Sequence, residues 1–264
     1  MEGFGMRSEK EVAVEAAKTA GRFLLENFRE EQKATSNERH AHIKADEESE
    51  RIILTTIKKN FPKHSIFSEE QGLKQQKSDY LWIVDPLDGT TNYLTKIPFF
   101  NVSIALAKKK EIVLGVVYSP ILDELFVAEK RKGAYLNAER IRVSEQTELI
   151  KSRLMTWKGG EGKPWENESI KTFLKNFRKL LPQVRTARLI SASALELCYV
   201  ACGRFEMFIN KGSALYDYAA GALIVKEAGG TVTNFKGEPW QMNMNEVVAS
   251  NKALNKKAIE IINN

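Results

Sequence analysis

Residues 85–93 read Asp85-Pro86-Leu87-Asp88-Gly89-Thr90-Thr91-Asn92-Tyr93 and directly follow an apolar, β-rich run at 80–84. We therefore expect Asp85 and Asp88 at the carboxyl end of a strand, where ligands of α/β sheets collect. A turn stiffened by proline lets the two carboxylates converge on one point. The carbonyl of Leu87 adds a third hard oxygen of the kind that Mg²⁺ or Ca²⁺ prefers. The stretch predicts a divalent cation site.

The next two residues, Gly89 and Thr90, lead into a predicted helix start. Free N–H groups at such a start favour a phosphate oxygen. A bare Asp-x-x-Asp-Gly pattern is more often a simple turn in which an aspartate caps a helix. The whole nine-residue string after an apolar strand reverses that balance, and it predicts metal-assisted phosphoryl chemistry.

Two more acidic positions support this hypothesis. Glu69 and Glu70 follow a predicted strand at 65–68, and Asp217 lies where the polar loop 210–213 meets a predicted helix. Taken singly, the glutamates would be solvated loop acids and Asp217 a helix cap. Taken together with the first stretch, they predict one acidic site.

Composition bounds the class of protein. The chain has 264 residues, of which 43% are hydrophobic and 28% charged, as in a globular protein of one large domain or two intimate halves. Its net charge of +6 would suit nucleic acid, an acidic membrane or small phosphorylated substrates. It has no apolar signal at its start and no apolar run of about 20 residues, so no membrane partner is expected. Cys198 and Cys202 match neither a zinc motif nor a disulfide framework, and a cytoplasmic location is expected.

Periodicity and turn residues predict an α/β or α+β fold of layered sheets and helices. The expected helices span 8–28, 47–61, 168–181, 193–202, 216–228 and a segment from 251. The expected strands span 65–68, 80–84, 101–107, 112–118, 125–129, 133–136, 186–190, 205–209, 231–234 and 247–249. The charged, glycine-rich segment 151–168 shows little regular signal. It is the expected boundary within a single domain of two lobes, about 1–150 and 151–264.

Residues 85–92 resemble the signature of the inositol monophosphatase family, which are lithium-sensitive, Mg²⁺-dependent phosphomonoesterases. Further stretches that resemble this family, in the same order, are 68–70, 115–118, 132–135, 217–221 and 227–230. The resemblance covers nearly the whole chain. It implies an α/β fold, a layered αβαβα sandwich of the sugar-phosphatase type, commonly a homodimer.

The resemblance also implies the metal ligands. Glu69, Asp85 and the carbonyl of Leu87 would hold one Mg²⁺. A second Mg²⁺ would be held by Asp85, Asp88 and Asp217. Two such cations lower the pKa of a water molecule and neutralise a leaving alkoxide.

The catalytic roles follow from the same resemblance. Thr90 with Glu69 would orient and activate the attacking water, assisted by Asp46. The amides of Gly89 and Thr90 would bind phosphate. No histidine and no covalent phosphoenzyme are implied.

One segment departs from the family pattern near Asp46. Family members usually carry Asp-x-Val-Thr-x-x-Asp, where this chain has His-Ala-His-Ile-Lys-Ala-Asp at 40–46. Only the last aspartate remains, so a third Mg²⁺ site stays open. His40 and His42 are expected to be solvated loop residues rather than replacement ligands.

The residues expected to contact the alcohol also depart from the pattern. Asn210 stands seven residues before Asp217, where inositol-specific members place a glutamate. Ser191 and Ala192 begin the stretch that replaces the family's Gly-Ser/Thr-Ala-Ala at the pocket. Lys211 would meet a second phosphate or lie in solvent. Recognition of the alcohol is therefore predicted to differ from that of a dedicated inositol enzyme.

The favoured function is a Mg²⁺-dependent phosphomonoesterase that uses metal-activated water on a small phosphate ester, an inositol or sugar monophosphate. The alternatives within the enzyme class are a 3′(2′),5′-bisphosphate nucleotidase and a fructose-1,6-bisphosphatase. An alternative of another class is a non-catalytic nucleic-acid-binding or regulatory protein on the same fold. The absence of a nucleic-acid-binding motif and the retention of every acidic ligand disfavour it.

Overall fold

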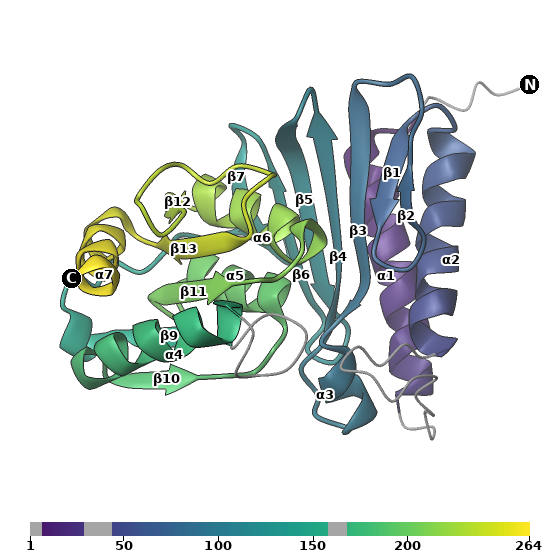
Figure 1. The fold of residues 1–264 in the computed structure, drawn as a ribbon. Coiled ribbons are helices and arrows are strands. Elements are labelled where there is room, and N and C mark those ends of the chain that lie inside the picture. The colour runs from purple at the N-terminus through teal and green to yellow at the C-terminus, as the bar shows by residue number, and fades with distance from the viewer. Residues whose placement is uncertain (1–6, 29–43, 158–167) are drawn as a thin grey trace, which may run out of the picture.

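Helices and sheets alternate in layers through the molecule (Figure 1). The computed structural model describes residues 7–28, 44–157 and 168–264. Helices α1 (Glu9–Asn27) and α2 (Lys44–Asn60) form the first layer, and an eight-stranded sheet forms the second. Helices α5 (Ser193–Ala201) and α6 (Leu215–Glu227), a five-stranded sheet, and helices α4 (Glu168–Leu180) and α7 (Lys252–Asn263) complete the stack. The predicted αβαβα sandwich is confirmed.

The first sheet has the strand order β2-β1-β3-β4-β5-β6-β7-β8. Its strands are β1 (Ser65–Ser68), β2 (Gly72–Lys74), β3 (Tyr80–Asp88), β4 (Asn101–Lys108), β5 (Glu111–Ser119), β6 (Glu124–Glu129), β7 (Gly133–Leu136) and β8 (Glu139–Arg140). The short helix α3 (Thr90–Leu94) follows β3. β1 and β3 are parallel, whereas β3 to β8 form an antiparallel meander. The sequence predicted this run of strands apart from β2 and β8.

The second sheet has the strand order β10-β9-β11-β13-β12. Its strands are β9 (Arg153–Thr156), β10 (Thr186–Arg188), β11 (Met207–Lys211), β12 (Thr231–Thr233) and β13 (Glu246–Ser250). One-turn 3₁₀ helices lie at Leu149–Lys151 and Leu181–Gln183. The expectation of little regular structure across 151–168 was wrong, because β9 pairs with both β10 and β11. The four residues of β9 lie among charges and glycines and are too few to show the apolar alternation of a strand. The division into lobes 1–150 and 151–264 stays a prediction.

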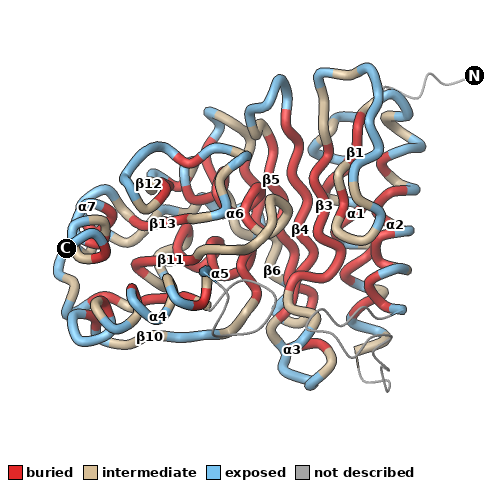
Figure 2. Tube along the Cα trace, in the orientation of Figure 1, coloured by how far each residue is buried: buried red, intermediate tan, exposed pale blue. Residues whose placement is uncertain are grey.

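Both faces of the first sheet are buried, as the red strands in Figure 2 show. Trp82 and Ile104 pack toward α1 and α2, whereas Ile83 and Ala105 pack toward α5 and α6. Strands that are buried on both faces have continuous apolar sequences, and this pattern made them predictable. A third core lies between the second sheet and the outer helices α4 and α7.

The first helix begins as its sequence predicts. Ser8 Oγ accepts a hydrogen bond from Glu11 N at 3.3 Å, and Ser8 N donates to Glu11 Oε2 at 2.9 Å, which completes a capping box. Along α1 the buried residues are mostly small, including Ala13 and Ala17, so the helix packs closely on α2 and the sheet. None of the helices in the described part of the chain is long and apolar enough for a bilayer.

Gly115 on β5 positions helix α6. A Cβ at this residue would lie 2.7 Å from the carbonyl oxygen of Ala220, well inside van der Waals contact. Only glycine allows α6 to approach the sheet this closely. Because α6 also carries Asp217, the close approach helps to bring that acid to the edge of the first sheet.

Candidate active site

A β-bulge places Asp85 and Asp88 on the same face of the first sheet. In a regular strand, residues three apart point to opposite faces. Here Asp85 pairs with Ser103 and Asp88 pairs with Asn101, so three steps along β3 match two steps along β4. The extra residue of the bulge, at 86–87, turns both carboxylates toward α5 and α6. The predicted convergence is therefore built by a backbone irregularity.

Asp217 comes to the same point from α6. Its Oδ2 accepts a hydrogen bond from Ala214 N at 2.6 Å, so the acid caps the helix from its third position and is not the N-cap residue itself. Ser103 Oγ donates to the carbonyl of Tyr216 at 3.4 Å, which ties the start of α6 to β4. Ligand oxygens of Asp85, Asp88 and Asp217 lie within 4.8 Å of one another.

Glu69 joins these residues from the neighbouring strand. It follows β1, which runs parallel to β3, and its N–H donates to the carbonyl of Val84 at 3.2 Å. The carboxyl groups of Glu69 and Asp85 lie close enough to influence each other's pKa. We call Glu69, Asp85, Asp88 and Asp217 the acid cluster.

Burial and mutual repulsion raise the pKa of every member of the acid cluster. Burial, with repulsion from Glu70, raises the pKa of Glu69 to about 7. Burial raises the pKa of Asp88 to about 6, although hydrogen bonds to its carboxylate act in the opposite direction. The pKa values of Asp85 and Asp217 lie well above the ordinary range because of burial and of the other acids. The cluster therefore needs protons or a cation to balance its charge.

The donor set fits Mg²⁺. All its ligand atoms are hard oxygens, and they converge from different elements on one small volume. Leu87 N donates to Asp85 Oδ1 at 3.1 Å, which shapes the turn between the two acids. The carbonyl of Leu87 accepts a hydrogen bond from Thr90 Oγ1 at 3.0 Å and retains its second lone pair. Of the residues predicted as metal ligands, Asp85, Leu87 and Asp88 thus lie in one turn. Glu69 and Asp217 reach it from neighbouring elements.

Gly89 and Thr90 lie where the sequence predicts a helix start. Gly89 is the N-cap of α3 with a φ of 95°, in the left-handed region that favours glycine. A Cβ there would also lie 3.0 Å from the carbonyl oxygen of Phe99. Glycine at this position therefore lets the chain turn directly from the acids into α3.

Asp46 is buried in the first turn of α2, which begins earlier than predicted. One turn further along, Ser49 Oγ donates to the carbonyl of Pro86 at 2.7 Å. This bond joins the helix that carries Asp46 to the turn between Asp85 and Asp88. His40 and His42 lie outside the described residues.

The predicted alcohol-binding residues are engaged in other contacts. Asn210 is buried, its Nδ2 donates to Ser213 Oγ at 2.9 Å, and its Oδ1 accepts from Lys211 N at 2.6 Å. Trp157 Nε1 also donates to Ser213 Oγ at 3.3 Å. Lys211 Nζ lies 3.7 Å from a carboxylate oxygen of Glu246. Asn210 therefore shapes its loop with both of its polar groups.

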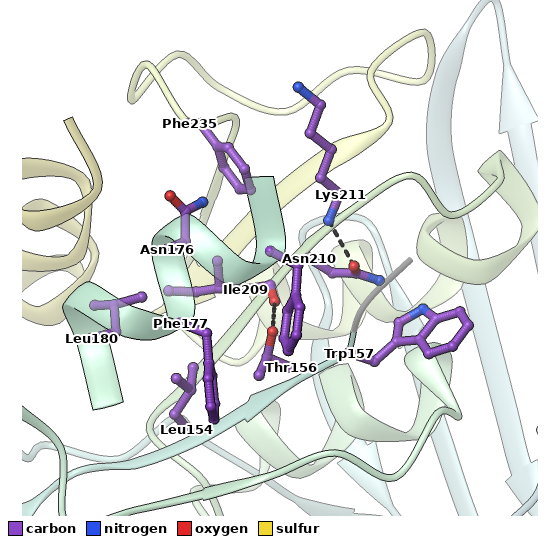
Figure 3. A pocket seen from close by; sticks show the side chains of 11 residues that line it. Leu154, Thr156, Trp157, Asn176, Phe177, Leu180, Ile209, Asn210, Lys211 and Phe235 are labelled. Carbon is purple, nitrogen blue, oxygen red and sulfur yellow. Dashed lines mark hydrogen bonds between the residues drawn. The ribbon is translucent and has the colours of Figure 1, made fainter. Parts of the chain in front are cut away.

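A small pocket lies beside these residues, under α4 (Figure 3). Phe173, Phe177 and Leu180 from α4 line it together with Asn210 and Lys211. Its enclosed volume of about 10 Å³ has room for about one water molecule. It is too small to hold a phosphate ester.

Ser191 and Ala192 precede α5. Ser191 has a φ of 63°, in the left-handed region, and Ala192 is the N-cap of the helix and fully buried. The next two residues donate to Asp88: Ser193 N to Oδ1 at 3.1 Å and Ala194 N to Oδ2 at 2.8 Å. Sequence reasoning missed these two donors, because nothing in the spacing marks an amide that faces an acid 105 positions away.

Fold and site together define a mixed α/β protein with a candidate divalent-metal site where its layers meet. The family model described as the inositol monophosphatase family matches residues 6–264. The chain belongs to this family.

The relatives carry two kinds of name. Inositol monophosphatase 1 of Solanum lycopersicum is 38% identical over 257 residues, which cover 95% of this chain and 93% of the relative. Nus factor SuhB of Escherichia coli (strain K12) is 36% identical over 245 residues, which cover 91% of this chain and 90% of the relative.

Solved structures agree with the fold. The extragenic suppressor protein SuhB of Bartonella henselae superposes with a TM-score of 0.90 at 36% identity, covering 96% of this chain and 97% of the other. The inositol monophosphatase of Anabaena superposes with a TM-score of 0.85 at 34% identity, covering 96% and 94%.

Proposed function

We propose that the protein is a Mg²⁺-dependent phosphomonoesterase that hydrolyses inositol or sugar monophosphates. The observation that carries this proposal is the convergence of Asp85, Asp88 and Asp217, whose oxygens lie within 4.8 Å of one another. Membership of the inositol monophosphatase family supports it. Two Mg²⁺ ions are proposed, with a third site open at 40–46.

The acid cluster and the Leu87 carbonyl are the proposed ligands of the two ions. Glu69, Asp85 and the Leu87 carbonyl would hold one ion, and Asp85, Asp88 and Asp217 the other. When bound, the ions supply Lewis acidity: they lower the pKa of a water molecule and neutralise charge on the leaving oxygen. Their positive charge also replaces the protons that the buried acids otherwise retain.

Thr90 and Glu69 are the proposed residues for handling the attacking water. The Thr90 hydroxyl donates to the Leu87 carbonyl, so its own lone pairs stay available to accept a hydrogen bond from the water. Glu69, whose carboxyl group lies in the acid cluster, is the proposed base that takes a proton from that water. Asp46 is proposed to assist from α2. The amides of Gly89 and Thr90 are the proposed hydrogen-bond donors to the phosphate group.

The alcohol half of the substrate is proposed to meet the loop 210–214 and the start of α5. Asn210 uses both of its polar groups within the loop, so we propose that it sets the loop's shape. Ser191 and Ala192 would line the pocket beside it. Lys211 lies near Glu246, a pairing that favours monophosphates over the bisphosphate alternatives, a bisphosphate nucleotide or fructose 1,6-bisphosphate.

The second candidate is a non-catalytic regulatory protein on the same fold. The relatives named Nus factor SuhB motivate it. The intact acid cluster favours the enzyme, because a protein without a metal gains nothing from buried acids that repel one another. A homodimer, inhibition by Li⁺ and a cytoplasmic location complete the proposal.

The test is a phosphate-release panel with purified full-length protein and Mg²⁺. Its substrates are inositol 1-phosphate, fructose 1,6-bisphosphate, adenosine 3′,5′-bisphosphate, histidinol phosphate and NADP. We expect turnover to be fastest on inositol 1-phosphate or on a sugar monophosphate added to the panel. Release from none of these esters would contradict the proposal and favour the regulatory candidate.

A further inference from the structure

Asn101 is a buried amide that faces the acid cluster and that the proposed mechanism does not use. It is the first residue of β4, is fully buried, and pairs with Asp88 across the β-bulge. Residues 101 and 103 point to the same face of β4, the face on which Asp85 and Asp88 meet. The side chain of Asn101 is therefore built into the site by the register of the strands.

The contact with Asp88 has a defined direction. Asn101 Nδ2 donates to Asp88 Oδ2 at 2.8 Å, and Ala194 N donates to the same oxygen at 2.8 Å. Ser193 N donates to the other oxygen, Oδ1, at 3.1 Å. Three donors thus take three of about four lone-pair sites of the carboxylate. The carboxylate is held in one orientation with about one site left for a cation.

The other end of the Asn101 amide is left without a partner. Its Oδ1 is buried and accepts no hydrogen bond from any described residue. A buried carbonyl oxygen without a donor lowers the stability of the folded chain. An apolar side chain of similar size would avoid that loss, so the amide is explained by what its N–H does for Asp88.

We propose that Asn101 is a positioning residue of the metal site: its amide, with the N–H groups of Ser193 and Ala194, fixes the Asp88 carboxylate in the orientation that accepts Mg²⁺. The inference rests on the proposed function, because it assumes that Asp88 is a metal ligand. Partners that orient a metal-binding side chain from behind contribute substantially to metal affinity.

The test compares Mg²⁺ binding by wild-type protein, Asn101→Leu and Asn255→Leu. Leucine keeps the approximate shape of the amide and removes its donor. Asn255 is the matched control, because it is also a buried amide, with Nδ2 donating to the Val248 carbonyl at 3.0 Å, but it lies on α7, which packs on the second sheet. Affinities are measured by calorimetry on the full-length protein, and melting temperatures are measured in EDTA.

Asn101→Leu is expected to weaken Mg²⁺ binding about tenfold while its melting temperature in EDTA stays at or above the wild-type value. Asn255→Leu is expected to lower the melting temperature and leave the affinity within about twofold. Raising Mg²⁺ should restore turnover of Asn101→Leu, as a loss of affinity alone requires.

Wild-type affinity in folded Asn101→Leu would overturn the positioning role. A wild-type protein that binds Mg²⁺ but hydrolyses no ester would overturn the proposed function and leave the calorimetric comparison decisive for Asn101. Weak Mg²⁺ binding by Asn101→Leu together with a melting temperature as low as that of Asn255→Leu would also count against the inference, because lost stability would then explain the weak binding.

Discussion

The segments at the ends of β3 and β11, residues 85–93 and 210–214, are stabilised in different ways. The loop 85–93 is bonded mainly to distant elements: Asp88 to the start of α5, and the Pro86 carbonyl to α2. The segment 210–214 is bonded to its own neighbours, through Asn210 to Ser213 and through Ser213 N to the Tyr218 hydroxyl at 3.3 Å. Apart from the pairing of β11 with β13, its hydrogen bonds to distant residues are fewer and involve Trp157 and Asn245.

This difference separates the residues proposed for metal binding from those proposed for recognition of the alcohol. A change in 85–93 disturbs several layers at once, so the metal-binding geometry belongs to the whole fold. A change at 210–213 touches no residue of the acid cluster directly, so these positions can change the alcohol that they meet, whereas Ala214 is tied to the cluster through Asp217. The departure at Asn210 falls in the loop that tolerates it.

The largest effect is expected from Asp85→Asn, which removes the first acid of the segment 85–93. Removing an acid that interacts with Glu69, Asp88 and Asp217 should lower Mg²⁺-dependent phosphate release by more than ~100-fold. Melting in EDTA should be unchanged or higher, since repulsion falls. Asp79→Asn, an exposed acid just before the same strand, is the control and should behave as wild type. Near-normal turnover in Asp85→Asn would refute the metal assignment.

The next effect is a pH dependence of stability, to which the acid cluster contributes together with the buried Glu196, whose pKa burial raises to about 8. The folded-state pKa of Glu69 is raised from 4.5 to about 7, and that of Asp88 from 3.8 to about 6. The folded protein therefore binds more protons than the unfolded chain between about pH 4 and 7, and its stability should fall as the pH rises through that window.

Thermal melts in EDTA across this range measure the slope. Mg²⁺ should flatten it, because the cation replaces the protons, and Asp85→Asn should reduce it. Metal-free protein that gains stability from pH 4 to 7 would contradict the description of the cluster.

Ser213→Ala sharpens the comparison from the side of the second loop. The Ser213 hydroxyl accepts hydrogen bonds from Asn210 and Trp157, so its loss should loosen the loop by about 1 kcal/mol. We expect KM for the ester to rise about fivefold with kcat within about twofold. Ser152→Ala, which removes a buried hydroxyl bonded to the Glu148 carbonyl, controls for the loss of a serine elsewhere. An unchanged KM would remove the loop from substrate recognition.

The smallest effect is expected from Ser191→Gly, before the helix that anchors Asp88. A non-glycine residue at a φ of 63° is disfavoured by about 1 kcal/mol, and glycine adds chain entropy to the unfolded state. The net gain in the free energy of unfolding should be at most ~0.5 kcal/mol, with kcat unchanged. Denaturant titration measures it, and a loss above ~1 kcal/mol would show that the hydroxyl has a structural role.

The sequence predicted the layers, most of the strands and the convergence of the acids. Apolar runs mark strands buried on both faces, and the pattern at 85–93 marks a turn between two acids. It missed β9, which is short and lies among charges, and it missed the donors that hold Asp88. Asn101 and Ser193 reach that acid through strand register and helix packing, which no local pattern encodes.

The central claim is that the acid cluster binds Mg²⁺ to hydrolyse a phosphate ester. The most direct measurement is phosphate release from the whole ester panel, sugar monophosphate included, by one preparation in EDTA and after Mg²⁺ is restored in excess. We predict no release above background in EDTA and full recovery with Mg²⁺. Undiminished release in EDTA would contradict the claim, and so would no release in Mg²⁺.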